Sequence, residues 1–247
     1  MYAWRSLRLG RKSNPTQSLC WVVHRYYVKG KTASSSRWLE RQHKDRYVRL
    51  ASQDNYRSRS AYKLIQIEDK FCFLKKNSVI VDLGAAPGAW SQVVSERVNL
   101  DDAAESSRII AVDVKDIKPI PGVTIVSNAD VLQAETLTKT MAAMAPFVQA
   151  DVILSDMAPS ASGNHSFDHY RIMELARAAL GISLSLLPSN AGVFLCKILE
   201  GREKKEFTAQ LKRHFEVVRE FRPPACRQNS SELYVIAWSR LKVSNTN

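Results

Sequence analysis

Cysteine is scarce in this 247-residue sequence, and its few copies show no pairing pattern. None belongs to a Cys-x-x-Cys motif, and they lie far apart, at Cys20, Cys72, Cys196 and Cys226. The sequence therefore predicts reduced thiols and gives no support to a disulfide framework or a zinc site. His165 and His169 have a spacing that suits metal ligands, but no third ligand is near, and the Ser, Gly and Asn residues around them predict a loop. We expect no bound metal.

Long hydrophobic runs and early acidic residues are also missing. The apolar run at residues 19–23 is far too short to span a bilayer, so we expect no membrane span. The first 39 residues hold eight Lys and Arg and no acid, whereas the whole chain has a formal charge of +12. Without these eight cations the chain has 28 basic and 24 acidic residues, a charge of +4. Most of the basic excess therefore belongs to this leader.

Residues 1–38 have the Arg-rich, Ser-containing and acid-free composition of a mitochondrial presequence. We therefore expect cleavage of this segment and a location in the mitochondrial matrix. A secretory signal fits less well, because no uninterrupted apolar core follows the first arginines. A basic arm that binds nucleic acid directly is the other interpretation of the same residues.

Residues 39–56 form a basic and aromatic N-terminal extension, in which Lys and Arg are interleaved with Tyr47 and Tyr56. Cations and aromatic rings suit contacts with phosphates and stacking on bases. A solvated helix face explains this composition about as well, so both interpretations stay open. One large domain is predicted at residues 57–240, followed by a frayed tail at 241–247.

The sequence is organised around a predicted strand at residues 79–83 that leads through a tight turn into a helix. Gly84 and Gly88 let the backbone of this turn approach a ligand closely, because neither carries a Cβ, and Pro87 stiffens it. The spacing is Gly-x-x-x-Gly, and the Gly-x-Gly-x-x-Gly motif of NAD and FAD sites is absent. This favours a ligand that lies over the loop, although similar turns occur in many α/β domains.

Predicted strands and helices alternate along the rest of the chain. Apolar runs predict further strands at residues 108–114, 123–126, 152–156, 191–198, 217–221 and 233–238. Helical patterns lie between them, at residues 90–98, 134–144, 170–187 and 204–214. The alternation predicts an α/β class, with a Rossmann-like, mostly parallel seven-stranded sheet and helices on both faces.

One more helix is predicted before the sheet, with Ser58 or Ser60 as its cap and an apolar face that includes Ala61, Leu64 and Ile65. Lys63 is expected on the polar side of this helix near its start, where the helix dipole disfavours a cation. That unfavourable position marks Lys63 as a candidate for a specific role.

Charged residues stand at the ends of several predicted strands. Asp113 lies near the C-terminal end of its strand, the end that faces the ligand crevice, where an acid commonly binds ribose hydroxyls. Asp156 ends another strand, Lys197 lies within a third, and Glu232 opens the last. Lys197 and Glu232, together with Lys63 and Asp156, can form a partly buried cluster in which the two positive and two negative charges neutralise each other. Such a cluster can also lower the pKa of a lysine by desolvation and cation repulsion, which makes a general base.

The chain resembles the FtsJ/RrmJ family of S-adenosylmethionine-dependent ribose 2′-O-methyltransferases over residues 57–238. The resemblance rests on the motifs Arg-Ser-Arg-Ser-Ala-Tyr-Lys-Leu, Asp-Leu-Gly-Ala-Ala-Pro-Gly-Ala-Trp-Ser-Gln, Ser-Asp-Met-Ala-Pro and Ser-Glu-Leu-Tyr-Val. It implies a catalytic tetrad at Lys63, Asp156, Lys197 and Glu232. It implies contacts with S-adenosylmethionine at Gly84, Ala85, Pro87, Gly88, Ala89, Trp90, Asp113, Asp130 and Asp156. Two departures, Ala89 for a common glycine and Cys196 for a frequent valine, remove no functional group.

The resemblance is strongest to the mitochondrial branch, which acts on large-subunit ribosomal RNA. It implies 2′-O-methylation of a uridine in the peptidyl-transferase A-loop, in support of mitochondrial ribosome assembly. Lys197 is the candidate base and Asp156 the residue that orients it, and no metal is required because the positive sulfur already activates the methyl donor. Transfer RNA is the rival substrate. A non-catalytic assembly factor should have lost tetrad members, and an NAD-dependent oxidoreductase would need the missing glycine motif.

Overall fold

A computed structural model describes residues 42, 44–98, 108–159 and 162–241. The chain divides into two units, residues 1–45 and 46–247, and the second contains the sheet and its helices. The predicted presequence at residues 1–38 lies outside the described residues, as do positions 242–247 of the predicted tail. Within the described ranges, no helix is both long and apolar enough to cross a membrane.

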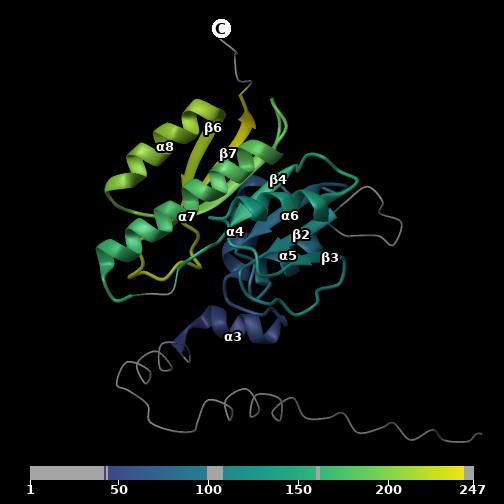
Figure 1. Cartoon of the computed structure of the whole chain (residues 1–247). Coiled ribbons are helices and arrows are strands. Elements are labelled where there is room, and N and C mark those ends of the chain that lie inside the picture. The colour runs from purple at the N-terminus through teal and green to yellow at the C-terminus, as the bar shows by residue number, and fades with distance from the viewer. Residues whose placement is uncertain (1–41, 43, 99–107, 160–161, 242–247) are drawn as a thin grey trace, which may run out of the picture. The chain divides into compact units, whose positions relative to one another are not determined.

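A seven-stranded sheet with the order β3-β2-β1-β4-β5-β7-β6 forms the centre of the second unit (Figure 1). Strands β1 to β5 are parallel to one another, and β7 lies antiparallel between β5 and β6. The predicted mostly parallel, seven-stranded α/β sheet is thereby confirmed. The strands are β1 (Val79–Leu83), β2 (Arg108–Val112), β3 (Val123–Val126), β4 (Val152–Ser155), β5 (Val193–Leu199), β6 (Phe215–Phe221) and β7 (Glu232–Arg240).

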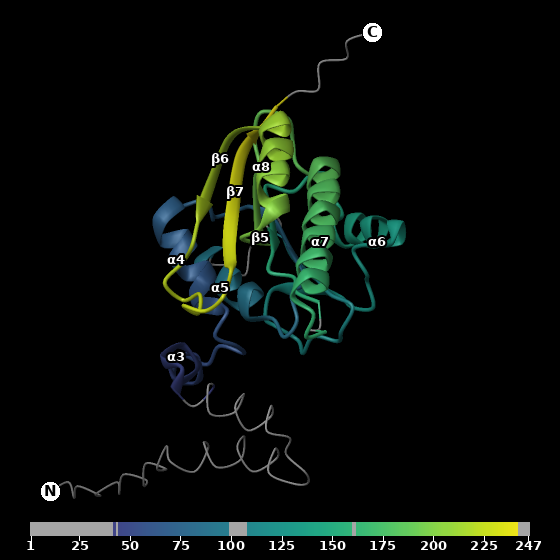
Figure 2. The same ribbon diagram turned by 90° about the vertical axis from the view of Figure 1, so that its left-hand side faces the viewer.

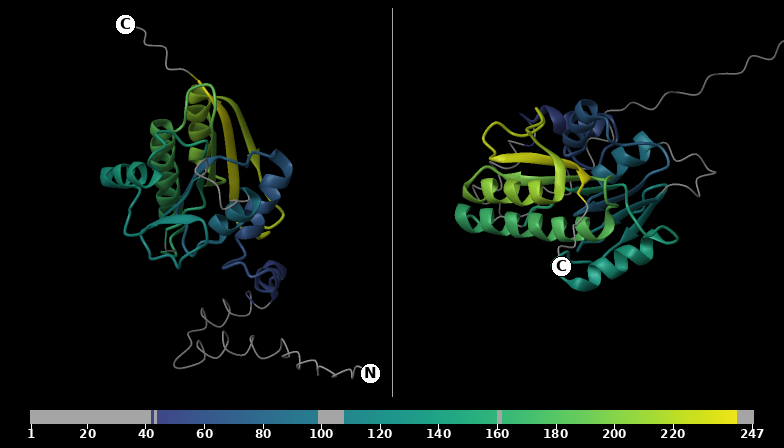
Figure 3. Two further views of the ribbon diagram at one scale, coloured as in Figure 1. Left: turned by 90° about the vertical axis from the view of Figure 1, so that its right-hand side faces the viewer. Right: turned by 90° about the horizontal axis from the view of Figure 1, so that it is seen from above.

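Helices cover both faces of the sheet, as predicted (Figure 2). The view from above separates two helical layers, with α4 and α5 on one side of the sheet and α6, α7 and α8 on the other (Figure 3). The helices are α3 (Arg46–Gln53), α4 (Ala61–Phe71), α5 (Ala89–Val98), α6 (Ala134–Met144), α7 (His165–Leu186) and α8 (Arg202–His214).

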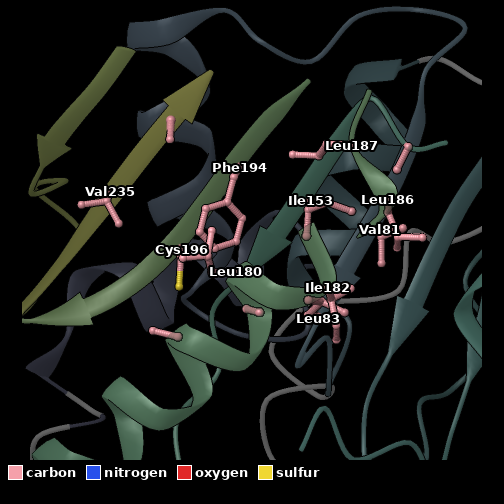
Figure 4. Close-up of a cluster of buried hydrophobic side chains, with 14 of the residues drawn as sticks. Val81, Leu83, Ile153, Leu180, Ile182, Leu186, Leu187, Phe194, Cys196 and Val235 are labelled. Carbon is pink, nitrogen blue, oxygen red and sulfur yellow. The ribbon is translucent and has the colours of Figure 1, made fainter. Parts of the chain in front are cut away.

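The core is divided between these two faces, because successive side chains of a strand point to opposite sides. In β1, Val81 belongs to the cluster on the α7 side, whereas Ile80 belongs to the cluster on the α4 side. Figure 4 shows the first cluster, where Phe194 of β5 lies beside Leu180 of α7. Burial on both faces explains why β1, β2 and β4 are nearly continuous apolar runs in the sequence.

Helix α7 begins at His165, earlier than the predicted start at residue 170. The prediction of a loop at His165 and His169 is therefore wrong. Asn164 starts the helix at this point, because its side-chain oxygen accepts a hydrogen bond from the Phe167 backbone N–H at 3.2 Å. The His169 ring contacts Glu203 of α8. Among the described residues, no three His, Cys, Asp or Glu side chains are grouped so that they could hold a metal ion.

Helix α4 departs from the prediction in two ways. Ser60 occupies the N-cap position but makes no capping bond with its side chain; its hydroxyl bonds that of Ser58 at 2.7 Å instead. Lys63 is not on a polar side, because the residue is only 9% exposed. The helix instead buries Lys63 together with its apolar residues Ala61 and Leu64. The prediction of a position on the polar side fails because the sequence does not show which side of a short helix meets the sheet, whereas the predicted burial in a charge cluster agrees with the structure.

The N-terminal extension contributes α3, in which Tyr47 is buried and packs against Tyr62 with ring centroids 5.4 Å apart. Tyr56 is also engaged, since its hydroxyl donates to Glu96 at 2.6 Å. From Arg46 onward these two rings pack against the domain. Neither a solvated helix face nor base stacking describes these two tyrosines, and both interpretations of the cations of the extension stay open.

Candidate active site

Charged side chains from separate elements meet at the edge where the parallel strands end. Asp156 directly follows β4, and Lys197 lies near the end of β5. Because β7 is antiparallel to β5, the start of β7 lies at this same edge, where Glu232 pairs with Leu199 and Tyr234 pairs with Lys197. The reversed strand thus brings a late part of the chain to the ends of β4 and β5.

These side chains share the face of the sheet that α4 covers. Leu195 and Ile236 belong to the core cluster on that face, and side chains two positions apart along a strand share a face. Lys197 and Tyr234 therefore point toward α4. Lys63, in the first turn of α4, completes the group.

Asp156 lies at the centre of this charge cluster, which we define as Lys63, Asp156, Lys197 and Glu232. The Lys197 ammonium donates to the Asp156 carbonyl oxygen at 2.7 Å and to its Oδ1 at 3.0 Å. The Lys63 Nζ lies 4.0 Å from the same Oδ1 and forms an ion pair with Glu232. The exposed fractions of the four side chains run only from 7% to 17%. All four residues of the expected tetrad are therefore brought together in a nearly buried site.

The cluster fixes the charge states of three of its members. Burial alone would raise the pKa of Asp156, but Lys197, Lys63 and the Tyr234 hydroxyl outweigh it and lower that pKa. Burial alone would raise the pKa of Glu232 as well, but Lys63 outweighs burial and lowers that pKa. Burial would lower the pKa of Lys63, but Asp156 and Glu232 together raise it. Lys63 therefore stays an ammonium at neutral pH.

Tyr234 is a member of the site that the sequence analysis missed. Its hydroxyl lies 2.7 Å from Asp156 Oδ1 and 3.0 Å from Glu232 Oε1, so it bridges the two carboxylates. Burial and these carboxylates raise the pKa of Tyr234 well above its usual value, so the phenol stays protonated. A signal was available in the sequence, because Glu232 and Tyr234 are two apart in a strand and must share a face.

The loop after β1 has the conformation expected of its glycines. Gly84 has φ +75°, and a Cβ there would lie 2.2 Å from the Met157 Cγ. Gly88 has φ +109°, and a Cβ there would lie 2.7 Å from the Arg57 Nη1. Both positions therefore favour glycine, because L side chains rarely adopt these positive φ values and a Cβ would require neighbouring side chains to move.

A cavity of about 430 Å³ opens beside this loop. Its wall includes the predicted cofactor residues Gly84, Asp113, Asp130 and Asp156, and apolar side chains such as Val114 and Leu132. Because Asp156 lines the cavity and also contacts Lys197, the cavity and the charge cluster adjoin at this residue. A volume of this size is that of a typical small-molecule site.

Asp113 connects the loop after β1 to the strand beside it. The Ala86 N–H donates to Asp113 Oδ2 at 2.8 Å, and the Lys115 N–H donates to Oδ1 at 2.8 Å. A carboxylate has about four acceptor positions, so each oxygen keeps capacity for a further hydrogen bond. Asp113 can therefore shape the loop and accept hydroxyl donors from a ligand at the same time.

The other predicted cofactor residues do not line this cavity. Ala85, Ala89 and Trp90 are buried at 5%, 1% and 2% exposure. The Trp90 indole donates to the Ser60 carbonyl at 2.9 Å, which joins α5 to the start of α4. Pro87 and Gly88 complete the turn between Gly84 and α5. These residues shape the loop, while Ala86, which the sequence analysis did not select, lines the cavity.

Asp82, at 1% exposure, is a second buried acid beside the loop, and its Oδ2 accepts a hydrogen bond from Ser91 at 2.7 Å. Burial raises the pKa of Asp82 to about 7, and the neighbouring Asp156 and Asp113 carboxylates add to this rise. In the unfolded chain an aspartate loses its proton near pH ~3.9. Between these two pH values Asp82 is protonated in the folded protein but not in the unfolded chain. The free energy of unfolding therefore falls by about 4 kcal/mol as the pH rises through that window.

We expect Asp82→Asn to remove this dependence, because an amide does not titrate. The melting temperature of the variant relative to wild type should rise steadily between about pH 4 and pH 7 and then level off. Thermal melts across this range measure the difference, with Asp116→Asn, an exposed position, as the control. A difference between variant and wild type that is constant with pH would contradict the assignment.

Comparison with known proteins decides the family. The FtsJ-like methyltransferase family matches residues 56–240, which include the loop after β1, the cavity and the whole charge cluster. The chain belongs to this family. The resemblance to the FtsJ family and the Rossmann-like methyltransferase fold are thereby confirmed.

Three relatives of this FtsJ-like methyltransferase carry names or titles that describe ribosomal RNA methyltransferases. The ribosomal RNA large subunit methyltransferase E of Wolbachia sp. subsp. Brugia malayi is 42% identical over 209 residues, which cover 85% of this chain and 90% of the relative. The protein of the same name from Rickettsia bellii is 40% identical over 212 residues, which cover 86% of this chain and 92% of the relative. A crystal structure described as a ribosomal RNA methyltransferase from Plasmodium falciparum superposes with a TM-score of 0.66 at 29% identity, over 75% of this chain and 99% of its own.

Proposed function

We propose that this FtsJ-like methyltransferase transfers a methyl group from S-adenosylmethionine to a ribose 2′-hydroxyl of large-subunit ribosomal RNA. One observation carries the proposal: Asp156 both lines the cavity and accepts a hydrogen bond from Lys197. A methyl donor in the cavity would thus lie beside a lysine that can act on the acceptor. The relatives named for ribosomal RNA large subunit methylation support the substrate class.

The residues of the cavity fit S-adenosylmethionine. The carboxylates of Asp113 and Asp130 supply acceptors for ribose hydroxyls, and Asp156 supplies negative charge near a sulfonium. Val114 and Leu132 are about half exposed at the wall, at 52% and 48%, and offer apolar surface to a nucleobase. The absence of a Cβ at Gly84 leaves the loop backbone open to close approach.

Bound S-adenosylmethionine supplies a methyl group that is already activated by a positive sulfur. A ribose 2′-hydroxyl is a weak nucleophile, so a base must remove its proton during attack. Lys63 cannot be that base, because two carboxylates keep its ammonium charged. Lys197 is held by one side-chain carboxylate and one backbone carbonyl, and in its neutral form its Nζ can accept the proton. Asp156 orients Lys197, Lys63 and Tyr234 contact Asp156, and Glu232 in turn holds Lys63 and Tyr234.

Calorimetry and methyl transfer test this function together. We expect the protein to bind S-adenosylmethionine in preference to NAD, and to place 2′-O-methyl marks on a large-subunit ribosomal RNA transcript. A transfer RNA transcript is the comparison, because transfer RNA is the rival substrate. Preferential NAD binding would exclude the methyltransferase mechanism, and binding without transfer to any RNA would favour a non-catalytic assembly factor.

The finer substrate assignment follows from the resemblance, and we propose it as such: a uridine of the A-loop in the mitochondrial large subunit, modified in support of its assembly. The eight cations and absence of acids in residues 1–39 support a mitochondrial matrix location. We expect a fusion of residues 1–38 to a reporter to be imported into mitochondria. A fusion with the arginines of this segment replaced by glutamine is the control, and a wild-type fusion that stays in the cytosol would contradict the location.

A further inference from the structure

Arg57 contacts both loops that flank the cavity, although it belongs to the segment before α4. Its Nη1 donates to the Pro87 carbonyl at 2.9 Å and to the Lys118 carbonyl at 2.7 Å, and its Nη2 donates to the Pro119 carbonyl at 2.7 Å. The Arg57 backbone N–H donates to the Gln92 side chain on α5 at 2.8 Å. One guanidinium therefore joins the loop after β1 to the loop after β2.

These two loops carry groups that face the proposed methyl donor. Pro87 lies between Gly84 and α5 in the loop after β1, and the loop after β2 begins with Asp113. The two loops are already joined once, by the bond from the Ala86 N–H to the Asp113 carboxylate at 2.8 Å. Arg57 adds a second connection farther along both loops. Two separate connections fix the position of the glycine turn relative to Asp113 more firmly than a single connection would.

The fit around Arg57 is close. A Cβ on Gly88 would lie only 2.7 Å from the Arg57 Nη1, so Gly88 leaves the space that the guanidinium occupies. The same short segment positions the catalytic side of the site, because the Ser60 carbonyl accepts the Trp90 indole N–H at 2.9 Å and Lys63 follows in α4. Arg57 is thus placed to connect the cavity with the helix that carries Lys63.

We propose that Arg57 is a positioning residue for S-adenosylmethionine, which it favours by holding the loops after β1 and β2 in the binding geometry. This inference rests on the proposed function. Preorganised loops raise affinity because the ligand does not have to order them. An arginine suits the task, because its planar guanidinium offers several donors in fixed directions, whereas a lysine ammonium is a single point on a flexible stem. A direct contact of Arg57 with RNA phosphate is the competing interpretation of a basic residue in this segment.

The two interpretations predict different kinetic constants. With Arg57→Lys, we expect the Kd and KM for S-adenosylmethionine to rise about fivefold, while kcat at saturating S-adenosylmethionine and the KM for RNA stay within about twofold of wild type. A purely structural role predicts a lower melting temperature without this split between KM and kcat. With Arg57→Ala, the Kd and KM for S-adenosylmethionine should rise further. If the alanine variant does not fold, Arg57→Lys alone is the test.

Arg97→Ala is the matched control. Like Arg57→Ala it removes one arginine, but from α5, where Arg97 pairs with Asp69 on the surface at 2.8 Å. An Arg57→Lys variant with wild-type affinity for S-adenosylmethionine and a raised KM for RNA would overturn the proposal in favour of phosphate contact. Unchanged constants for both substrates would overturn it as well. A wild-type protein that binds no S-adenosylmethionine would be a distinct result, because it would reject the proposed function itself.

Discussion

Replacement of Lys197 by alanine is expected to lower the rate of methyl transfer by about 10² or more, with little change in S-adenosylmethionine affinity. The lysine is 7% exposed and lies in an apolar strand, where an amine without partners or a task would be costly to bury. Its Nζ contacts Asp156, and because Lys63 and Tyr234 also contact that carboxylate, Asp156 should keep its place in the cavity wall when the lysine is lost. Single-turnover methyl transfer to ribosomal RNA, run beside cofactor titrations, measures both quantities.

Lys197→Arg separates a base from a structural cation. A guanidinium keeps its proton at any working pH and cannot accept another, so this variant should be almost as inactive as the alanine variant. Lys139→Ala, which removes an exposed lysine of α6 that pairs with Glu135, is the control and should leave transfer unchanged. An active Lys197→Arg protein would overturn the assignment of the base, although not the family.

Removal of the Asp113 carboxylate is expected to weaken S-adenosylmethionine binding by more than about tenfold, about 1.4 kcal/mol. Two losses combine in Asp113→Ala: the acceptors for ribose hydroxyls, and the bond from the Ala86 N–H that shapes the loop after β1. Calorimetry measures the affinity directly. The neighbouring exposed Asp116→Ala changes the charge equally and should bind normally.

Asp113→Asn separates the loss of the ribose acceptor from the loss of the bond to the Ala86 N–H. The amide oxygen can still accept one backbone N–H, so the loop should keep its conformation, while the ribose loses an ionised partner. We expect an intermediate affinity for this variant. Affinity equal to wild type in both Asp113 variants would show that the ribose is held elsewhere.

Much of the fold could be predicted from the sequence, because parallel strands covered on both faces must be apolar throughout. The apolar runs at β1, β2 and β4 and the glycine turn after β1 were therefore recognisable. Helix starts were harder to predict. Asn164 begins α7 within a polar segment, and the hydrogen bond to the Phe167 N–H that makes it a cap is visible only in three dimensions.

The site was predictable as a set of residues but not as a geometry. Motifs select Lys63, Asp156, Lys197 and Glu232, yet nothing local indicates that Asp156 contacts both lysines or that Lys63 is buried. Tyr234 was missed because a tyrosine in an apolar strand has the pattern of an ordinary core residue. Arg57 likewise resembles a surface cation, and its three carbonyl partners come from segments about 30 and 60 positions away in the sequence.

The insertion of β7 between β5 and β6 has a consequence for the order in which the protein is made. In the described sheet, β6 pairs with β7 and is synthesised before it, so a growing chain carries β6 without its pairing partner. The same last strand delivers Glu232 to Lys63, an ammonium that is buried in the finished protein. A chain that stops short of β7 thus leaves β5 with an open edge and the charge cluster with two cations and one acid. The charge cluster and the described sheet are therefore completed by the same event, the pairing of β7 with its two neighbours.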